Sequence, residues 1–276
     1  KGSEFFNWAY KGMIDAAEML DPEIEGELQG PSTWDATQEA RAVEQLIAKG
    51  VDGIILTAGE ANALVPAINR AIEAEIPVIT FDSDAPKSNR LSFVGTNNYQ
   101  AGFVAGEEMS EWLDGTGKVA ISTFPGPAHL AERVSGFKAA LPEGIEVVAT
   151  VNDEGEVAIA ETQITAMLQA NPEIDAIFAA HGNPGPGAAA ALRNVNKAGE
   201  IEIMGFDFGM PVIELIEKGE IRGTVGQDPY LMGYMAMIEA YSANHPTEVV
   251  SQNPPFGHTA PTIDTGVSIL YEDDID

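Results

Sequence analysis

Short apolar runs alternate with longer helical patterns along the whole chain. Apolar runs of about 4–8 residues are typical of strands buried on both faces of a parallel sheet. Such runs occupy 53–58, 77–81, 118–122, 175–179 and 201–206. Helical spacing of apolar residues is found at 5–20, 35–49, 62–74, 99–113, 130–141, 157–169, 186–197, 211–218 and 230–244. Strands that alternate with helices in this way require crossover connections, so the sequence predicts an α/β fold with mostly parallel sheets.

The two halves of the chain repeat one arrangement. In each half, a strand, a helix and a second strand are followed by Phe-Asp, and the spacing from Asp52 to Asp82 is close to that from Asp175 to Asp207. Two similar α/β lobes are the simplest interpretation. The alternative is that unrelated strand-helix-strand units resemble one another in composition. In either lobe the second aspartate lies just past a strand, at the edge where open parallel sheets bind ligands.

The charge of the chain excludes several classes of partner. Its 276 residues include 43 Asp and Glu but only 14 Lys and Arg, for a net charge of −29. Such a protein repels phosphate backbones and anionic membrane surfaces, so we expect no nucleic-acid partner and no docking on lipid headgroups. The absence of cysteine excludes disulfides and thiolate chemistry. A saline habitat is one hypothesis for this acidity.

Catalytic signatures are missing from the sequence. It contains no phosphate-binding Gly-x-x-x-x-Gly-Lys-Ser/Thr loop and no Gly-x-Ser-x-Gly motif. The glycine-rich segment 182–187 holds two prolines, which remove the N–H groups that a phosphate cradle needs, so we interpret it as a turn before a helix. The four histidines are not spaced as metal ligands. We therefore expect no enzyme, no metal site and no cofactor.

Binding of a neutral polyol is better supported by the residues. Sugars are held by carboxylates and amides, which exchange hydrogen bonds with hydroxyl groups, and by aromatic rings that cover C–H faces. The candidates follow strands or begin helices: Asp82, Asp207, Asn183, Gln227, Arg133, Phe5, Phe6 and Trp8. Each has a structural alternative. The aromatic residues are also compatible with a helix core, the arginine with an ion pair, and the aspartates with turns or helix caps.

Several blocks in order along the chain resemble the type I periplasmic binding proteins of the ribose-binding family, the solute receptors of ABC importers. These blocks are 5–6, 11–13, 16–17, 47–55, 76–84, 94–98, 132–137, 205–207 and 224–229. The resemblance implies two Rossmann-like lobes with parallel sheets, joined by three crossings that act as a hinge. It places the first lobe at 1–96 and 228–256, and the second at 97–227 and 257–276. Family members have a strand ahead of the Phe5-Phe6 loop, so a gap is expected in the first lobe.

The resemblance also implies roles for individual residues. Phe5 and Phe6 would stack on or flank a sugar ring, while hydrogen bonds to its hydroxyls would come from Asp82, Arg133, Asp207 and Gln227. Where the family usually has Asn, this chain has His181, with Asn183 two residues later, so either is a candidate contact. The usual aromatic residue near 157 is absent, and 153–156 is Asp-Glu-Gly-Glu instead. Asp84 is a further candidate, because Ser83 stands where some members carry Arg.

The function implied is that of a periplasmic or extracellular receptor, lipid-anchored in some settings. Such a receptor closes its two lobes on a monosaccharide or polyol and presents it, as a monomer, to a membrane permease. Two alternatives share the fold: a receptor for furanosyl quorum signals, and the effector-binding half of a lac-repressor-type regulator. A third is an enzyme that uses Asp82 and Asp207 as an acid/base pair. The sequence does not distinguish one sugar from another.

Overall fold

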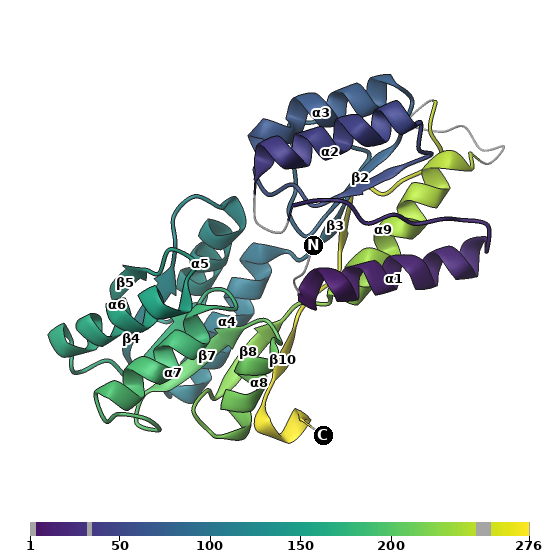
Figure 1. The fold of residues 1–276 in the computed structure, drawn as a ribbon. Coiled ribbons are helices and arrows are strands. Elements are labelled where there is room, and N and C mark those ends of the chain that lie inside the picture. Colours follow the sequence, from purple (N-terminus) through teal and green to yellow (C-terminus); the bar gives the residue numbers. More distant parts are fainter. Residues whose placement is uncertain (1–3, 32–34, 247–254, 276) are drawn as a thin grey trace. The chain divides into compact units, whose positions relative to one another are not determined.

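The computed structural model describes residues 4–31, 35–246 and 255–275. The chain forms two compact units, one of Lys1–Thr96 with Asp228–Thr265 and one of Asn97–Gln227 with Gly266–Asp276. In each unit, helices cover both faces of a largely parallel sheet (Figure 1). The predicted α/β fold with two lobes is therefore confirmed.

Unit 1 is built on a four-stranded, fully parallel sheet. Its strands, in spatial order, are β1 (Ile54–Leu56), β2 (Val78–Phe81), β3 (Ser92–Gly95) and β9 (Thr262–Asp264). Its helices are α1 (Glu4–Leu20), α2 (Ala36–Lys49), α3 (Ala61–Glu73) and α9 (Pro229–Asn244). Successive side chains of a strand point to opposite faces, so Val78 packs with α2 and α3 while Ile79 packs with α1 and α9.

Unit 2 has a larger sheet. Its strands, in spatial order, are β10 (Ser268–Leu270), β8 (Gly223–Gly226), β7 (Glu202–Phe206), β6 (Ala176–Ala179), β4 (Gly117–Thr123) and β5 (Ile145–Asn152). All neighbours are parallel except β10, which runs antiparallel to β8. Its helices are α4 (Asn98–Trp112), α5 (Ala128–Ala140), α6 (Val157–Ala170), α7 (Pro184–Asn194) and α8 (Met210–Glu217), followed near the end by the 3₁₀ turn η1 (Glu272–Asp274). Helices α4 and α5 pack on one face, and α6, α7 and α8 on the other.

Helices α4 and α5 approach each other closely at two glycines, Gly102 and Gly136. A Cβ atom added to Gly102 would lie 1.9 Å from the carbonyl oxygen of Arg133, and one added to Gly136 would lie 1.9 Å from that of Tyr99. No side chain fits at either distance, so the two backbones are in direct contact. This contact determines where the α5 backbone places Arg133.

The chain passes between the units three times, after Thr96, after Gln227 and after Thr265. The third passage differs from the boundary expected at 256–257. Residues 257–265 lie with unit 1 because β9 pairs in parallel with β3, Val94 lying opposite Ile263. Of the predicted hinge segment 253–256, residues 253 and 254 are outside the described residues. The lobes as moving bodies stay a prediction.

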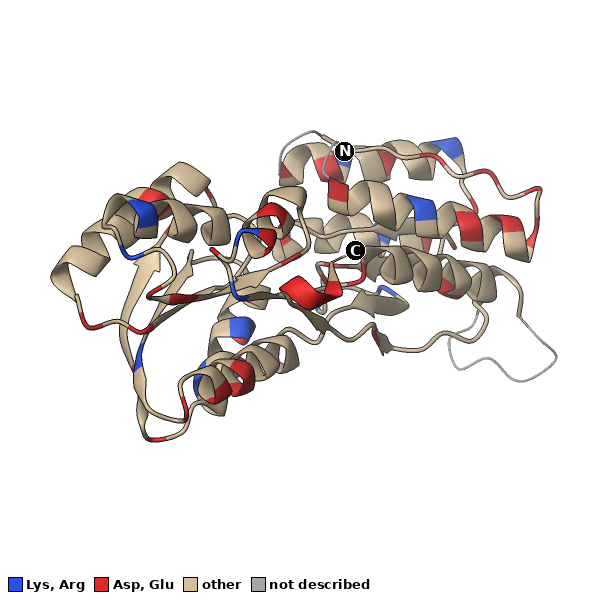
Figure 2. Ribbon diagram, turned by 90° about the horizontal axis from the view of Figure 1, so that it is seen from below, with Lys and Arg blue, Asp and Glu red and all other residues tan. Residues whose placement is uncertain are grey.

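Acidic residues are spread over helices and loops of both units, with few basic residues among them (Figure 2). In the described part of the chain, no helix is long and apolar enough to cross a membrane.

Candidate functional site

Two aspartates occupy the same position in the two units. Asp82 directly follows β2 and Asp207 directly follows β7, in each case after a phenylalanine. Both have left-handed backbone conformations, with φ of 60° for Asp82 and 66° for Asp207. Aspartate is among the few residues with a side chain that adopt this conformation readily. The left-handed turn ends each strand and leaves a carboxylate at the ligand-binding edge of a parallel sheet.

In unit 1, the Asp82 carboxylate accepts hydrogen bonds from two hydroxyl groups. The donors to its Oδ2 atom are Thr57 Oγ1, at 3.1 Å, and Ser83 Oγ, at 3.3 Å. The backbone N–H of Asp82 donates to the carbonyl of Val94, at 3.0 Å. The side chain is half-buried, so part of it lies at the protein surface.

Asp84, the other carboxylate of this segment, has a different environment. Arg90 binds both of its oxygens, with Nε 2.7 Å from Oδ1 and Nη2 2.7 Å from Oδ2. The Oδ1 atom also accepts from Thr80 Oγ1 at 2.6 Å and from the backbone N–H of Ala85 at 2.7 Å. Its acceptor sites are thus largely filled from within unit 1. Its role as a ligand contact stays a prediction that these bonds do not favour.

The aromatic candidates of unit 1 lie in the first turns of α1. Phe5 and Phe6 meet edge to face, with ring centroids 5.4 Å apart. The Phe6 ring also meets Phe81, at the end of β2, with centroids 6.2 Å apart. Both are half-buried against the core, which leaves part of each ring exposed near the strand ends. Trp8 is 53% exposed.

In unit 2, Arg133 is a buried cation, only 4% exposed. Its Nε donates to Asn98 Oδ1 at 2.7 Å and its Nη1 to the carbonyl of Ala180 at 3.1 Å. The guanidinium lies over the ring of Phe206, 3.8 Å from the ring centroid. These contacts hold the plane of the guanidinium in one orientation at the ends of β6 and β7. A planar guanidinium suits two adjacent hydroxyl oxygens.

Asp207, which follows β7, and Gln227, which follows β8, form a hydrogen-bonded pair. Gln227 Nε2 donates to Asp207 Oδ1 at 2.9 Å, and Thr224 Oγ1 donates to the Asp207 backbone carbonyl at 2.9 Å. Gln227 is 8% exposed. A Cβ atom added to Gly182 would lie 3.2 Å from Asp207 Oδ2, so glycine leaves room for the carboxylate there. The pair presents an amide and a carboxylate together.

His181 is tied to a buried aspartate that the sequence analysis did not select. Its Nε2 lies 2.9 Å from Oδ1 of Asp153, which is fully buried, and its Nδ1 lies 3.5 Å from the backbone N–H of Asn183. Burial raises the pKa of Asp153. Hydrogen bonds from His181, Gly155 and Ser122, together with the nearby imidazole, lower it by more, so the net pKa lies below its usual value. Asp153 therefore stays ionised and orients the His181 ring.

Asn183 also has an internal partner. Its Nδ2 donates to the carbonyl of Gly155 at 2.6 Å, so its side-chain amide is held against the segment 153–156. The residue is the N-cap of α7, which begins at Pro184, so only 182 and 183 of the glycine-rich segment form the turn, and 184–187 are the first turn of the helix itself.

Ser122, His181 and Asp153 do not form a nucleophile-activating triad. Ser122 Oγ donates to Asp153 Oδ2 at 2.8 Å, while His181 binds Oδ1 of the same carboxylate. The serine is thus bonded to the acid and not to the imidazole, which a triad would require as its base. Within the described residues, no group of three His, Asp or Glu side chains is placed to hold a metal ion.

Phe124 is a second residue that the sequence analysis missed. It directly follows β4, and its ring meets that of His181 edge to face, with centroids 5.2 Å apart. It also lies against Gly155, in the segment where an aromatic residue was expected and not found. The rule that identified Asp82 and Asp207, a residue just past a buried strand, would have identified Phe124 as well.

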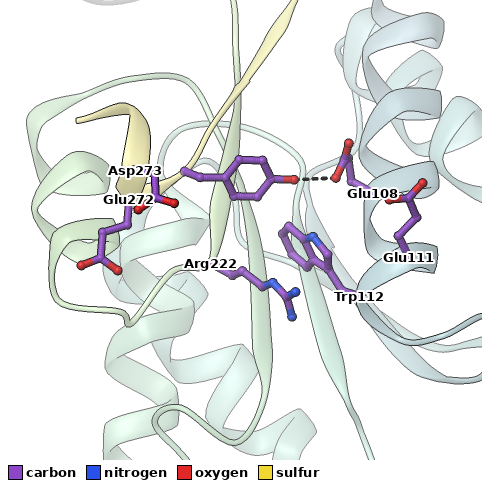
Figure 3. Close-up of a pocket in the computed structure, with 7 residues that line it drawn as sticks. Glu108, Glu111, Trp112, Arg222, Glu272 and Asp273 are labelled. Carbon is purple, nitrogen blue, oxygen red and sulfur yellow. Dashed lines mark hydrogen bonds between the residues drawn. The ribbon is translucent and has the colours of Figure 1, made fainter. Parts of the chain in front are cut away.

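A different cavity of about 510 Å³ lies in unit 2 (Figure 3). Four of its residues interact with one another. The Tyr271 hydroxyl donates to Glu108, and Arg222 lies over the ring of Trp112, 4.7 Å from the centroid. Burial and the bond to Glu108 raise the pKa of Tyr271 to about 12. None of its lining residues is among the strand-end residues described above, and Arg222 already covers the ring of Trp112.

Comparison with known proteins decides the family. Residues 1–243 match the family described as periplasmic binding protein domain. The chain belongs to this family. The predicted resemblance is confirmed.

Relatives of this periplasmic binding protein include the ribose import binding protein RbsB of Bacillus subtilis. It is 28% identical over 216 residues, which cover 78% of this chain and 70% of the relative. The D-ribose/D-allose-binding protein of Pseudomonas aeruginosa is 26% identical over 201 residues, or 70% of this chain. The match spans only 63% of the length of that relative.

Solved structures match over nearly the whole length. The sugar-binding protein of a sugar ABC transporter from Bacillus halodurans has a TM-score of 0.93 and 33% identity, covering 100% of this chain and 96% of the other. A solute-binding protein from Burkholderia graminis, in complex with D-arabinose, has a TM-score of 0.89 and 30% identity, covering 99% and 93%.

His129, which lies near Arg133 and His181 in unit 2, gives a testable effect of pH on stability. Burial, with the positive charges of Arg133 and His181, lowers the pKa of His129 from 6.5 to about 4. A lowered pKa means that the unfolded chain takes up the proton first. The stabilisation from His129 is then complete above pH 6.5 and is lost as the pH falls towards 4. We expect a loss of about 3 kcal/mol between pH 7 and pH 4, measured by urea unfolding.

The His129→Gln variant should lack this part of the pH dependence. His245→Gln, which changes an exposed histidine of unit 1, serves as the control and should keep it. If the unfolding free energies of the His129 variant and the wild type fall in parallel with pH, the histidine does not titrate in this way.

Proposed function

We propose that the protein is the solute receptor of an ABC importer and binds a neutral monosaccharide or a related polyol. The observation that carries this proposal is the buried, oriented guanidinium of Arg133 beside the Asp207–Gln227 pair. Together these groups supply a fixed guanidinium, a carboxylate and an amide, which are polar groups of the kind that bind sugar hydroxyls. The names of the relatives, which bind ribose, allose or arabinose, support the same class of ligand.

In this proposal a single sugar takes hydrogen bonds from side chains of both units. Asp82 supplies a carboxylate from unit 1, and Arg133, Asp207 and Gln227 supply the polar groups of unit 2. Phe5 and Phe6 cover one face of the ring, and Phe124 covers the other in place of the aromatic residue missing near 157. Asp84 holds Arg90, and Asp153 holds His181, so both carboxylates position their neighbours.

A ligand that contacts both units stabilises their closed arrangement only by its greater affinity for it. We propose that this closed form, as a monomer, is recognised by a membrane permease, and that the receptor works in the periplasm or at the cell surface. None of the relatives reported above is named as a quorum-signal receptor, a regulator or an enzyme, so the importer receptor is favoured over those alternatives.

A thermal-shift screen tests the proposal and identifies the ligand class. The panel contains pentoses, hexoses, deoxysugars, polyols and furanosyl signals, each at millimolar concentration. A ligand at 100 times its Kd adds about 2.7 kcal/mol to the free energy of unfolding, which raises the midpoint by several degrees. We expect a shift confined to one class of sugar. No shift with any compound, in a protein shown to be folded, would contradict the proposal.

A further inference from the structure

His129 lies at the same edge of the unit 2 sheet as the strand-end residues. It is in the first turn of α5, the helix that follows β4, so it is near the carboxyl end of that strand. Open parallel sheets bind their ligands at this edge. In the sequence, the spacing of His129 from the other histidines excluded a metal site and gave no sign of a contact with a ligand.

The imidazole of His129 is close to two side chains of unit 2. His129 and Arg133 are four residues apart on α5, so their side chains lie on the same face of the helix, one turn apart. The charges of Arg133 and His181 both lower the pKa of His129, which requires both groups to be near its ring. His129 therefore belongs to the group of side chains around Arg133.

The two neighbouring histidines differ in their hydrogen bonds. For His181, Nε2 lies 2.9 Å from Asp153 Oδ1, and Nδ1 faces the backbone N–H of Asn183 at 3.5 Å. For His129, no hydrogen bond to either ring nitrogen is found within residues 4–31, 35–246 and 255–275. His129 is thus the imidazole of this pair that has hydrogen-bonding capacity for a ligand.

At neutral pH the His129 ring is uncharged. Burial, with the charges of Arg133 and His181, lowers its pKa to about 4. A neutral imidazole has one N–H donor and one nitrogen acceptor, and a hydroxyl group can bond to either. Removing polar atoms from water without a hydrogen-bond partner is unfavourable, so a ligand hydroxyl beside this partly desolvated ring gains affinity. The chemistry of His129 therefore suits a neutral polyol.

The helix itself does not depend on this imidazole. The N-cap of α5 is Pro127, and the buried side chains of the helix are those of Leu130, Arg133 and Phe137. His129 is only half-buried, outside this buried set. A half-buried polar side chain that is not part of the core is available to a ligand.

We propose that His129 is a specificity-determining residue of the sugar site and binds one hydroxyl group of the ligand beside Arg133. This role rests on the proposed function and deepens it. The residue selects sugars that carry a hydroxyl group at this position. It disfavours the analogue in which that single hydroxyl is replaced by hydrogen, because the imidazole nitrogen then loses its partner.

Titration calorimetry with monodeoxy sugars tests this role. The probes are D-ribose, D-arabinose, D-allose and the other sugars of the thermal-shift panel, followed by every monodeoxy derivative of the tightest binder. His129→Leu removes both ring nitrogens and should weaken binding of the parent sugar at least about tenfold. One derivative should bind equally well to this variant and to the wild type, because neither complex contains the hydrogen bond. His258→Leu, which changes an exposed histidine of unit 1, is the matched control and should leave every Kd unchanged.

Nitrogen-15 NMR of the histidine-labelled wild-type protein gives a readout that needs no variant. Saturation with the parent sugar should shift a ring-nitrogen resonance of His129 and leave those of His258 unchanged. The derivative that lacks the recognised hydroxyl should leave the His129 resonances in place.

The outcomes separate this role from the proposed function. Equal Kd values of the wild type and His129→Leu for the parent sugar, or unshifted His129 resonances at saturation, would overturn the role while the receptor function stands. The same loss of affinity for the parent sugar and for every derivative would overturn it as well, because such a loss reflects a change in structure. If the wild-type protein binds no sugar, the receptor function fails and the role of His129 fails with it.

Discussion

Replacing Arg133 with lysine is expected to weaken sugar binding by about 100-fold. The guanidinium donates to Asn98 and to the carbonyl of Ala180 while its plane lies over Phe206. A lysine ammonium lacks the planar fork and cannot keep these contacts while also reaching two adjacent hydroxyl groups. Losing about two charge-assisted hydrogen bonds to the ligand costs on the order of 3 kcal/mol, which corresponds to the fold-change given.

Titration calorimetry with the sugar found by thermal shift measures this change. Arg193→Lys, which alters an arginine of unit 2 that pairs with Glu220 on the surface, is the matched control and should leave Kd unchanged. Thermal midpoints without sugar show whether each variant is folded. A folded Arg133→Lys protein with the wild-type Kd would mean that Arg133 supports the fold of unit 2 and does not touch the ligand.

Removing either strand-end carboxylate should raise Kd at least about tenfold. Asp82→Ala and Asp207→Ala each delete the acceptor of a ligand hydroxyl, and a buried hydroxyl without its partner costs about 1.4 kcal/mol or more. Because the two residues belong to different units, equal sensitivity at both positions would support a ligand held by both.

Backbone strain requires its own control in this experiment. Both aspartates have positive φ, where alanine is disfavoured, so part of any loss would come from a distorted turn. Asp114 is exposed and has a φ of 50°, so Asp114→Ala introduces the same kind of strain away from both clusters. Wild-type affinity in Asp82→Ala and Asp207→Ala would remove both residues from the proposed site.

Two of the strands that the sequence predicted are buried on both faces, but the fully buried β8 (Gly223–Gly226) was not predicted, because glycine and threonine interrupt its apolar run. The runs at 77–81 and 175–179 coincide with β2 and β6, in which every residue is buried. The edge strands β9 and β10 were not predicted from their pattern, because they are only three residues long and partly exposed. The strand β5 has one buried residue, and polar residues at 146, 150 and 152 interrupt its apolar positions, so it shows no long apolar run.

Part of the candidate site was predicted because its residues directly follow apolar strands. Asp82 and Asp207 follow strands that are mostly apolar, and that position alone indicates their edge of the sheet. Asp153 was hidden because it belongs to the run Asp-Glu-Gly-Glu, which resembles a solvated turn, and only the fold reveals that this one carboxylate is buried. The pairing of Asp84 with Arg90 depends on a loop conformation that no periodic pattern encodes.

The glycine contact between α4 and α5 has a consequence for protein engineering. Since bare backbone at Gly102 and Gly136 positions the arginine, the outward-facing side chains of the two helices contribute little to its placement. A library that randomises those outward positions should yield many folded receptors of unchanged ligand preference. Mutations that retune selectivity should be sought instead among the residues that directly follow the strands.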